Sequence, residues 1–163
     1  MLDAHPDHGD AEAVPQRLAA LRAAGMDETR LTDLGFHAFS MLVNQAAFTP
    51  ARLVLLAIEP ALIKLRPLFS PVARDALFAA GILYLQSEED WPRGAGTFAR
   101  LRDGLVKQTP RGQAADPLFW PALRGEVITL HRLDRGAEAT SLLQSFMDAY
   151  PGAPDDLRHQ LEG

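Results

Sequence analysis

Apolar residues recur along the chain with the spacing of amphipathic helices. From Ala11 to Ala24 they lie on one face, and Gly25 follows at the position where a helix end favours left-handed backbone. A second helix is predicted from about Glu28 to Ala46; it is apolar over more than one face and should be well buried. No segment shows the sustained alternation of a strand, since residues 127–130, the one candidate, lie within a helical run. The pattern therefore predicts an all-α protein.

Later helices are marked by a polar residue just before a proline. Such a side chain accepts unpaired backbone N–H groups, and a proline at the first helical position loses no hydrogen bond. The four marks are Thr49-Pro50, Ser70-Pro71, Asp90-Trp91-Pro92 and Asp116-Pro117. Helices are therefore predicted to start near residues 50, 71, 91 and 117. One more helix follows from about Arg135 to Tyr150, and a short turn from Asp155 to Leu161 ends the chain. Pro60 should kink or split the helix that contains it.

Regular helix lengths favour an internal repeat. Shifting the chain by 44 residues aligns Gly81 with Gly125, and it places Ala51, Ala95 and Ala139 in one column. We interpret the unit as a helical hairpin in which glycine allows close approach of the partner helix and alanine begins the second helix. The predicted fold is about three stacked antiparallel helical hairpins, tetratricopeptide-like. HEAT-type repeats fit the period better, and a plain helical bundle is the alternative.

A single helical-repeat domain is predicted over residues 11–163, preceded by a flexible N-terminus over residues 1–10. The chain has 163 residues, of which 47% are hydrophobic and 23% charged, as in ordinary globular proteins. The N-terminal residues lack the basic and apolar stretches of a secretory signal, and no apolar run is long enough to span a membrane. The absence of cysteine is consistent with a reducing cytoplasm, and frequent arginine, alanine, glycine and proline favours a bacterial source.

Charge and motifs argue against several classes of function. The formal net charge is −5 and the basic residues are scattered, which disfavours nucleic-acid binding. His5 and His8 flank Pro6-Asp7, but two terminal imidazoles without partners are a poor metal site. The acidic run Glu88-Glu89-Asp90 is better explained as the cap between two helices. No nucleophile elbow or phosphate loop is present, so we expect no catalytic residues, no cofactor and no enzymatic activity.

The repeat predicts a concave face lined by the first helix of each pair. A largely apolar groove of this kind receives an amphipathic helix or an extended peptide. Its expected partner-binding residues are Leu34, Ala38 and Met41 in the first pair, Phe78, Ile82 and Leu85 in the second, and Ala122, Glu126 and Thr129 in the third. Trp91 and Trp120, at predicted helix starts, are expected to pack between neighbouring hairpins. His37, His131 and His159 are isolated and are expected at the surface.

The order and pattern of these helices resemble a known family. A helical pair ends at Leu62-Ile63-Lys64-Leu65-Arg66-Pro67, another helix opens at Trp91-Pro92-Arg93-Gly94-Ala95, and a further pair opens at Phe119-Trp120-Pro121. Over about residues 34–151 the chain is similar to the small tetratricopeptide-like chaperones of bacterial type III secretion systems, in particular the needle-subunit and Hrp-type group. The similarity is one of size, order and helix pattern.

The resemblance implies a cytoplasmic bacterial chaperone. Its groove would hold the amphipathic C-terminal helix of a secreted, self-assembling subunit, often together with a small helical co-chaperone, and would so prevent premature polymerisation. A helical-repeat scaffold in another assembly is the first alternative, and a small helical ligand-binding domain or enzyme is the second. Because exposed apolar grooves self-associate, we also expect a weak homodimer when the protein is alone.

Overall fold

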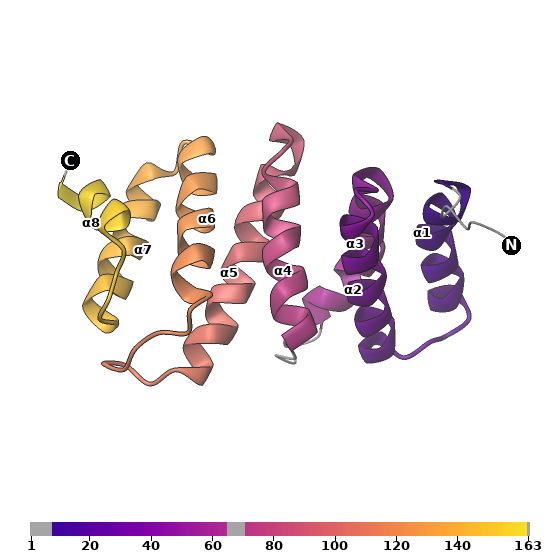
Figure 1. The fold of residues 1–163 in the computed structure, drawn as a ribbon, viewed down its shortest axis with the longest axis horizontal. Helices are drawn as coiled ribbons and strands as arrows, with labels where there is room; N and C mark the ends of the chain where they lie inside the picture. Colours follow the sequence, from indigo (N-terminus) through magenta and orange to yellow (C-terminus); the bar gives the residue numbers. More distant parts are fainter. Residues whose placement is uncertain (1–7, 65–70, 163) are drawn as a thin grey trace, which may run out of the picture. The chain divides into compact units, whose positions relative to one another are not determined.

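A computed structural model describes residues 8–64 and 71–162, and in this part of the chain helices joined by loops are the regular structure, without a strand (Figure 1). None of its helices is long and apolar enough to cross a membrane. Its elements are α1 (His8–Ala23), α2 (Glu28–Asn44), α3 (Phe48–Lys64), α4 (Pro71–Tyr84), the 3₁₀ turn η1 (Glu88–Asp90), α5 (Trp91–Gln108), α6 (Phe119–Arg132), α7 (Gly136–Ala149) and α8 (Asp155–Glu162). The predicted all-α class is confirmed.

The contacts group the expected single domain into two compact units. Unit 1 comprises residues 1–76 and unit 2 comprises residues 77–163, so the division falls inside α4. The expected flexible segment over residues 1–10 lies largely outside the described residues, and α1 already begins at His8. Each unit has its own buried apolar core and is described separately below.

Unit 1 is built on the pairing of α2 with α3, and α1 packs against both of these helices. Gly25 ends the first helical segment with a positive φ of 87°, as its position predicts. On α2 the buried side chains include Leu31, Phe39 and Leu42. A Cβ on Gly35 would collide with the Ile58 side chain of α3, which shows how closely the two helices approach.

Unit 2 places α5 between α4 and α6. The buried ring of Phe98 on α5 lies against Gly81 of α4 and Gly125 of α6, and a Cβ on either glycine would be 2.5 Å from the ring's Cζ. Helices α6, α7 and α8 then pack in sequence order (Figure 1). The two glycines that the 44-residue shift aligns thus lie against one ring. Gly81 faces the second helix of its own predicted pair, whereas Gly125 faces the second helix of the preceding pair.

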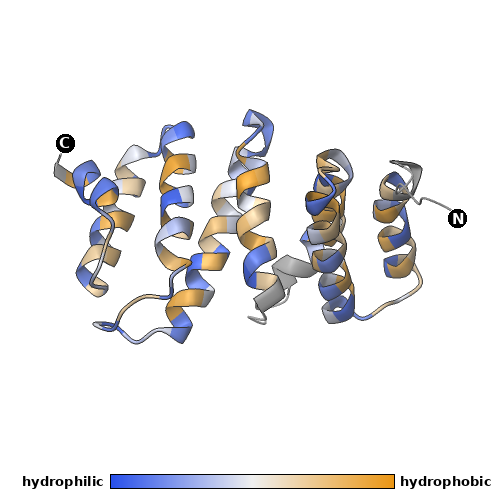
Figure 2. Cartoon of the chain, viewed as in Figure 1, coloured by the Kyte–Doolittle hydropathy of each residue, from blue (hydrophilic) through white to orange (hydrophobic). Residues whose placement is uncertain are grey.

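The alanine column also occupies equivalent places. Ala51, Ala95 and Ala139 all lie in the first five residues of α3, α5 and α7, and all three are buried. In Figure 2 polar and apolar residues are interleaved along each helix, as expected of amphipathic helices that bury one face. The order of the helices is therefore as predicted, and their arrangement as repeat hairpins stays a prediction.

The predicted helix starts are close to those observed, but the capping explanation was wrong at three of the four sites. Thr49 lies inside α3, and Asp90 makes no capping hydrogen bond to α5. Asp116 instead accepts from the backbone N–H of Leu118 at 2.9 Å, ahead of α6. Ser70 lies outside the described residues. The fixed φ of proline favours a helix start without any side-chain cap, and this explains why the boundaries were still predicted correctly.

Two further expectations concern single residues in the helices. Pro60 lies inside α3 without splitting it, so a proline in the last turns of this helix is accommodated. Asp27 caps the N-terminus of α2, since its carboxylate accepts from the backbone N–H of Arg30 at 3.3 Å. Asp27 was not predicted as a cap, although an aspartate just before a helix is a standard start signal.

Candidate partner-binding surfaces

An exposed apolar stripe runs along α2 in unit 1. Leu34 is 42% exposed and Met41 is 47% exposed, while Ala38 between them is half-buried. Their spacing of four and three residues puts all three on one face of the helix. Another side of α2 carries Phe39 and Leu42 into the core. The stripe therefore lies on the outward side of the helix, where Leu34 and Met41 are exposed apolar side chains.

The corresponding residues of α4 are presented unequally. Ile82 is 42% exposed, whereas Phe78 and Leu85 are half-buried. The Phe78 ring meets Phe98 edge-on, with 6.2 Å between the ring centroids. Ile82 is therefore the residue of this set that a partner reaches most freely. Because the α2 and α4 sets belong to different units, we treat them as two separate surfaces.

The carbonyl oxygen of Leu85 has a structural role at the end of α4. It accepts from the indole N–H of Trp91 at 3.2 Å and from the Arg132 guanidinium at 3.0 Å. The Arg132 guanidinium also lies 5.6 Å from the centroid of the Trp91 ring. These contacts join the ends of α4 and α6 to the start of α5. Trp91 therefore contacts residues at the ends of α4 and α6, while its place between repeat hairpins stays a prediction.

The third predicted set does not line an open face, and this expectation was wrong. Ala122, Glu126 and Thr129 are all buried. The α5 helix covers their side of α6: Glu126 is bonded to an arginine of α5, and the Thr129 methyl group lies 3.8 Å from where a Cβ of Gly94 would be. Equivalent repeat positions therefore differ in exposure. Helix α5 covers α6 at Glu126, whereas no described helix of unit 2 covers α4 at Ile82.

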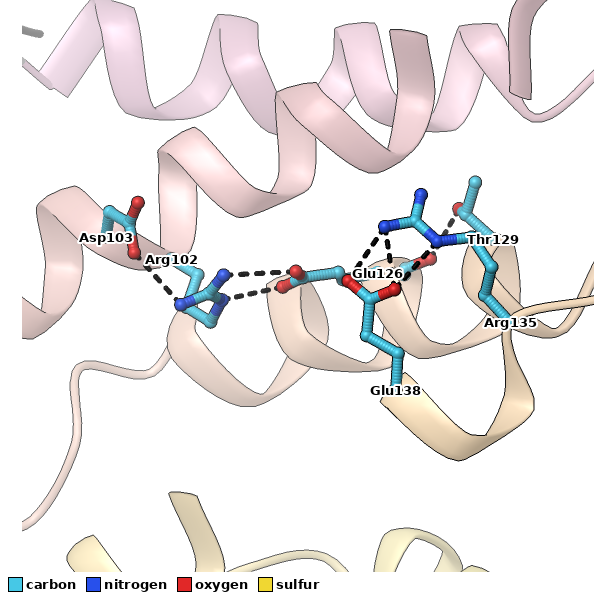
Figure 3. Close-up of polar contacts among 7 residues, drawn as sticks. Arg102, Asp103, Glu126, Thr129, Arg135 and Glu138 are labelled. Carbon is cyan, nitrogen blue, oxygen red and sulfur yellow. Dashed lines mark hydrogen bonds and ion pairs between the residues drawn. The ribbon is translucent and has the colours of Figure 1, made fainter. Parts of the chain in front are cut away.

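The buried carboxylate of Glu126 is held by a two-point ion pair. Arg102 donates to its two oxygens at 2.7 and 3.1 Å, and it also donates to Asp103 at 2.9 Å. Figure 3 shows the guanidinium between the two carboxylates, with the exposed pair Arg135–Glu138 nearby at the start of α7. Burial raises the pKa of Glu126, and the hydrogen bonds from Arg102 only partly offset that rise.

An aromatic cluster adjoins this ion pair. The Phe119 ring lies 4.9 Å from Trp120, 5.3 Å from Phe146 and 5.1 Å from Tyr150, measured between centroids. The guanidinium of Arg102 lies 5.1 Å from the Phe146 centroid, so the arginine is held by a carboxylate and a ring together. Both Glu126 oxygens are engaged, and the arrangement serves to join α5 to α6. Sequence reasoning selected Glu126 but not Arg102, because no local spacing links residues in different helices.

Several apolar side chains at the surface were not selected from the sequence. Leu21 on α1 and Phe48 and Leu53 on α3 are each more than one-third exposed. All three belong to unit 1, so this unit presents more apolar surface than the α2 stripe alone. Their positions fall within predicted helices, but the side of the helix that stays uncovered depends on packing and is not set by the local pattern.

The isolated histidines lie where the sequence predicts. His37, His131 and His159 are all exposed, and His5 lies outside the described residues. Among residues 8–64 and 71–162, no three His, Cys, Asp or Glu side chains come together as a metal site would require. Comparisons with protein-family models, curated proteins and solved structures find no match to this chain.

Proposed function

We propose that this protein is a tetratricopeptide-like helical-repeat module that binds an amphipathic helix of another polypeptide. The observation that carries the proposal is the exposure of Leu34 and Met41 on α2 and of Ile82 on α4. Apolar residues at helical spacing are the usual receptor for the apolar face of a partner helix. Buried alanines at equivalent places near the starts of α3, α5 and α7 support the repeat interpretation.

The exposed apolar area of these side chains determines how tightly a partner helix is expected to bind. Removing the remaining exposed part of a leucine, methionine or isoleucine side chain from water contributes about 1 kcal/mol. Association costs several kcal/mol in lost freedom of motion, so one stripe alone binds weakly. Tight binding therefore needs a partner that covers several of the exposed apolar side chains, which favours a helix of several turns over a short loop.

A narrower form of the proposal rests on the sequence resemblance. The partner would be a secreted, self-assembling helical subunit, held with or without a small co-chaperone in the bacterial cytoplasm. A helix whose apolar face is covered cannot pack against copies of itself, so binding would prevent premature assembly. The scaffold alternative keeps the same surfaces but takes a partner that is neither secreted nor self-assembling.

The decisive experiment is affinity purification from the native cells, with surface variants compared side by side. Met41→Asp and Ile82→Asp each place a charge in an exposed apolar position. Gln45→Asp and Gln86→Asp, four residues after Met41 and Ile82 and just beyond the ends of α2 and α4, place the same charge at exposed polar positions. A specific partner should be recovered in stoichiometric amount with the wild type and with both controls, and lost with Met41→Asp or Ile82→Asp.

Other outcomes separate the alternatives. Equal recovery with all four variants would reject binding through these stripes. Recovery of a small secreted helical subunit would support the chaperone form, and a subunit of another assembly would support the scaffold form. Stabilisation by a metal or a common metabolite in a thermal-shift screen would instead favour the ligand-binding class. A strict monomer by light scattering at high concentration would reject the weak homodimer.

A further inference from the structure

Most cations of unit 2 are engaged by acceptors within the unit. Its nine lysines and arginines, from Leu77 onward, divide into two groups. Five have bonded acceptors or ion-pair partners: Arg93 with Asp90, Arg102 with Glu126, Arg124 with Asp156, Arg132 with the Leu85 carbonyl, and Arg135 with Glu138. The remaining four make no ion pair within the described residues: Arg100, Lys107, Arg111 and Arg158.

Three of these four cations lie close together in the sequence. Arg100 and Lys107 are seven residues apart on α5, which places them on one face of the helix with about 10 Å between their Cα atoms. Arg93 is seven residues before Arg100 on the same face, although Asp90 lies 3.5 Å from its guanidinium. Arg111 follows in the exposed loop after α5. We call Arg100 and Lys107 the α5 basic face.

Lys107 is exposed and Arg100 is half-buried, and one acidic residue lies between them. Asp103, the acidic residue between them, is already bonded to Arg102 at 2.9 Å. Gly96, one turn before Arg100, is exposed, and a Cβ built on it would meet nothing within 4 Å. A partner chain can therefore approach the backbone of α5 at Gly96 and place carboxylates against the two basic side chains.

We infer that the α5 basic face binds an acidic polypeptide segment. The charges are complementary: of the four basic residues of α5, Arg100 and Lys107 make no ion pair within the described residues and can pair with carboxylates of a partner. Carboxylates on a partner helix repeat at intervals of three, four or seven residues, and these intervals match the spacing of Arg100 and Lys107. The surface uses none of the residues of the α2 and α4 stripes, so the inference does not depend on the proposed function.

Nucleic acid and membrane are poorer matches to the same face. Binding to a phosphate backbone requires a broader basic surface, because each neutralised phosphate contributes separately, and the net negative charge opposes it. A membrane surface requires apolar residues that enter the lipid beside the cations. The neighbouring exposed positions on α5 are instead Pro92, Gly96 and Asp103.

The test is fluorescence anisotropy of a labelled oligoglutamate peptide with the full chain at low and high salt. The test variant is Arg100→Glu/Lys107→Glu. The matched control, Arg17→Glu/Arg158→Glu, makes the same change in charge at two exposed arginines outside the face. We expect salt-sensitive binding to the wild type, a loss of at least roughly tenfold in the test variant, and a much smaller loss in the control.

Every other result overturns the inference. No binding at low salt, or an equal loss in test and control variants, would mean that the face has no specific role. Tighter binding of oligothymidylate or phosphatidylserine vesicles, lost in the same variant, would assign the face to another class of partner. Circular dichroism verifies folding, and Arg100→Gln/Lys107→Gln replaces the test variant if charge reversal disturbs the helix; a loss of roughly fivefold is then expected.

Discussion

Gly81 on α4 and Gly125 on α6 lie against the same phenyl ring, that of Phe98, so that a Cβ on either would be 2.5 Å from its Cζ. The Phe98 side chain is completely buried between these helices. A glycine costs helix stability of about 1 kcal/mol relative to alanine. At both positions the packing of the Phe98 ring against the glycine therefore offsets the lower helix propensity of glycine.

Replacement of either glycine by alanine should destabilise unit 2. The added methyl group would overlap the Phe98 ring, and overpacking of a dense core costs about 1–3 kcal/mol, more than the gain in helix propensity. We expect Gly81→Ala and Gly125→Ala each to lower the free energy of unfolding by about 1–2 kcal/mol, measured by urea denaturation.

The matched control is Gly96→Ala on α5. Gly96 is exposed and a Cβ there meets no atom within 4 Å, so this variant should be more stable than the wild type by about 0.5–1 kcal/mol. Adding Phe98→Leu to Gly81→Ala should cost less than the two changes separately, because the smaller side chain makes room for the methyl group. Strict additivity would contradict the contact.

The Arg102–Glu126 ion pair should be costly to break from the arginine side. Arg102→Met leaves the buried Glu126 carboxylate without its donor, and removing one partner of a buried pair typically costs about 3–5 kcal/mol. Burial already holds the pKa of Glu126 above its ordinary value despite Arg102. Without the guanidinium the pKa rises further, so the folded state binds the proton still more tightly.

The sign of the pH effect follows from that raised pKa. A carboxyl group whose pKa is higher in the folded state than in the unfolded state favours folding when it is protonated. The contribution of Glu126 to the free energy of unfolding therefore falls as the pH rises above 4.5, the ordinary pKa of a glutamate. Arg102→Met should therefore be less destabilising at pH values below 4.5 than at neutral pH, in urea titrations at both. In a Glu126→Gln background the destabilisation by Arg102→Met should be the same at both pH values. If it still depended on pH, a titrating group other than Glu126 would be responsible.

Helix order followed from the sequence because its signals are local. Apolar spacing and proline positions predicted every helix start to within a few residues, and Gly25 marked the first stop correctly. The shift of 44 also singled out Gly81 and Gly125 as points of close helix approach. For Gly125, however, the approaching helix is α5 and not α7, the predicted partner in its own pair.

The exposure of the predicted binding residues did not follow from the sequence in the same way. Ile82 and Glu126 occupy equivalent repeat positions, yet one is 42% exposed and the other is buried. The difference arises from the neighbouring helix: α5 covers Glu126 and supplies Arg102 as its partner. A contact between residues that are 24 positions apart depends on how two helices are aligned, and no local pattern fixes that alignment.

Ile82→Asp should leave the fold intact. The side chain is 42% exposed, so an aspartate there stays hydrated, and the free energy of unfolding should fall by no more than about 1 kcal/mol. Leu77→Asp, five residues earlier on α4, is the contrasting variant because Leu77 is buried, and it should abolish cooperative unfolding of unit 2. Circular dichroism and thermal melting distinguish the two. A collapse of helical content in Ile82→Asp would place that residue in the core and remove it from the proposed surface.

The docking of α8 should depend on Leu157 far more than on its ion pair. Leu157 is completely buried, whereas the Arg124–Asp156 pair, at 2.8 and 2.9 Å, is solvent-exposed. Leu157→Ala should cost about 2–5 kcal/mol of docking free energy. Because α8 ends the described chain, the loss should appear locally, as faster hydrogen exchange in residues 158–161 while α5 and α6 stay protected.

Asp156→Asn is the matched change at the adjacent position. The hydrogen bond from Arg124 lowers the pKa of Asp156, so this carboxylate stabilises the folded state above its ordinary value of 3.8 and the contribution is lost as pH falls below it. An exposed pair is screened by salt and contributes little, so Asp156→Asn should leave exchange in α8 nearly unchanged at neutral pH. If Asp156→Asn released α8 as fully as Leu157→Ala does, the helix would be held by charge, and raising the salt concentration would release it from the wild type as well.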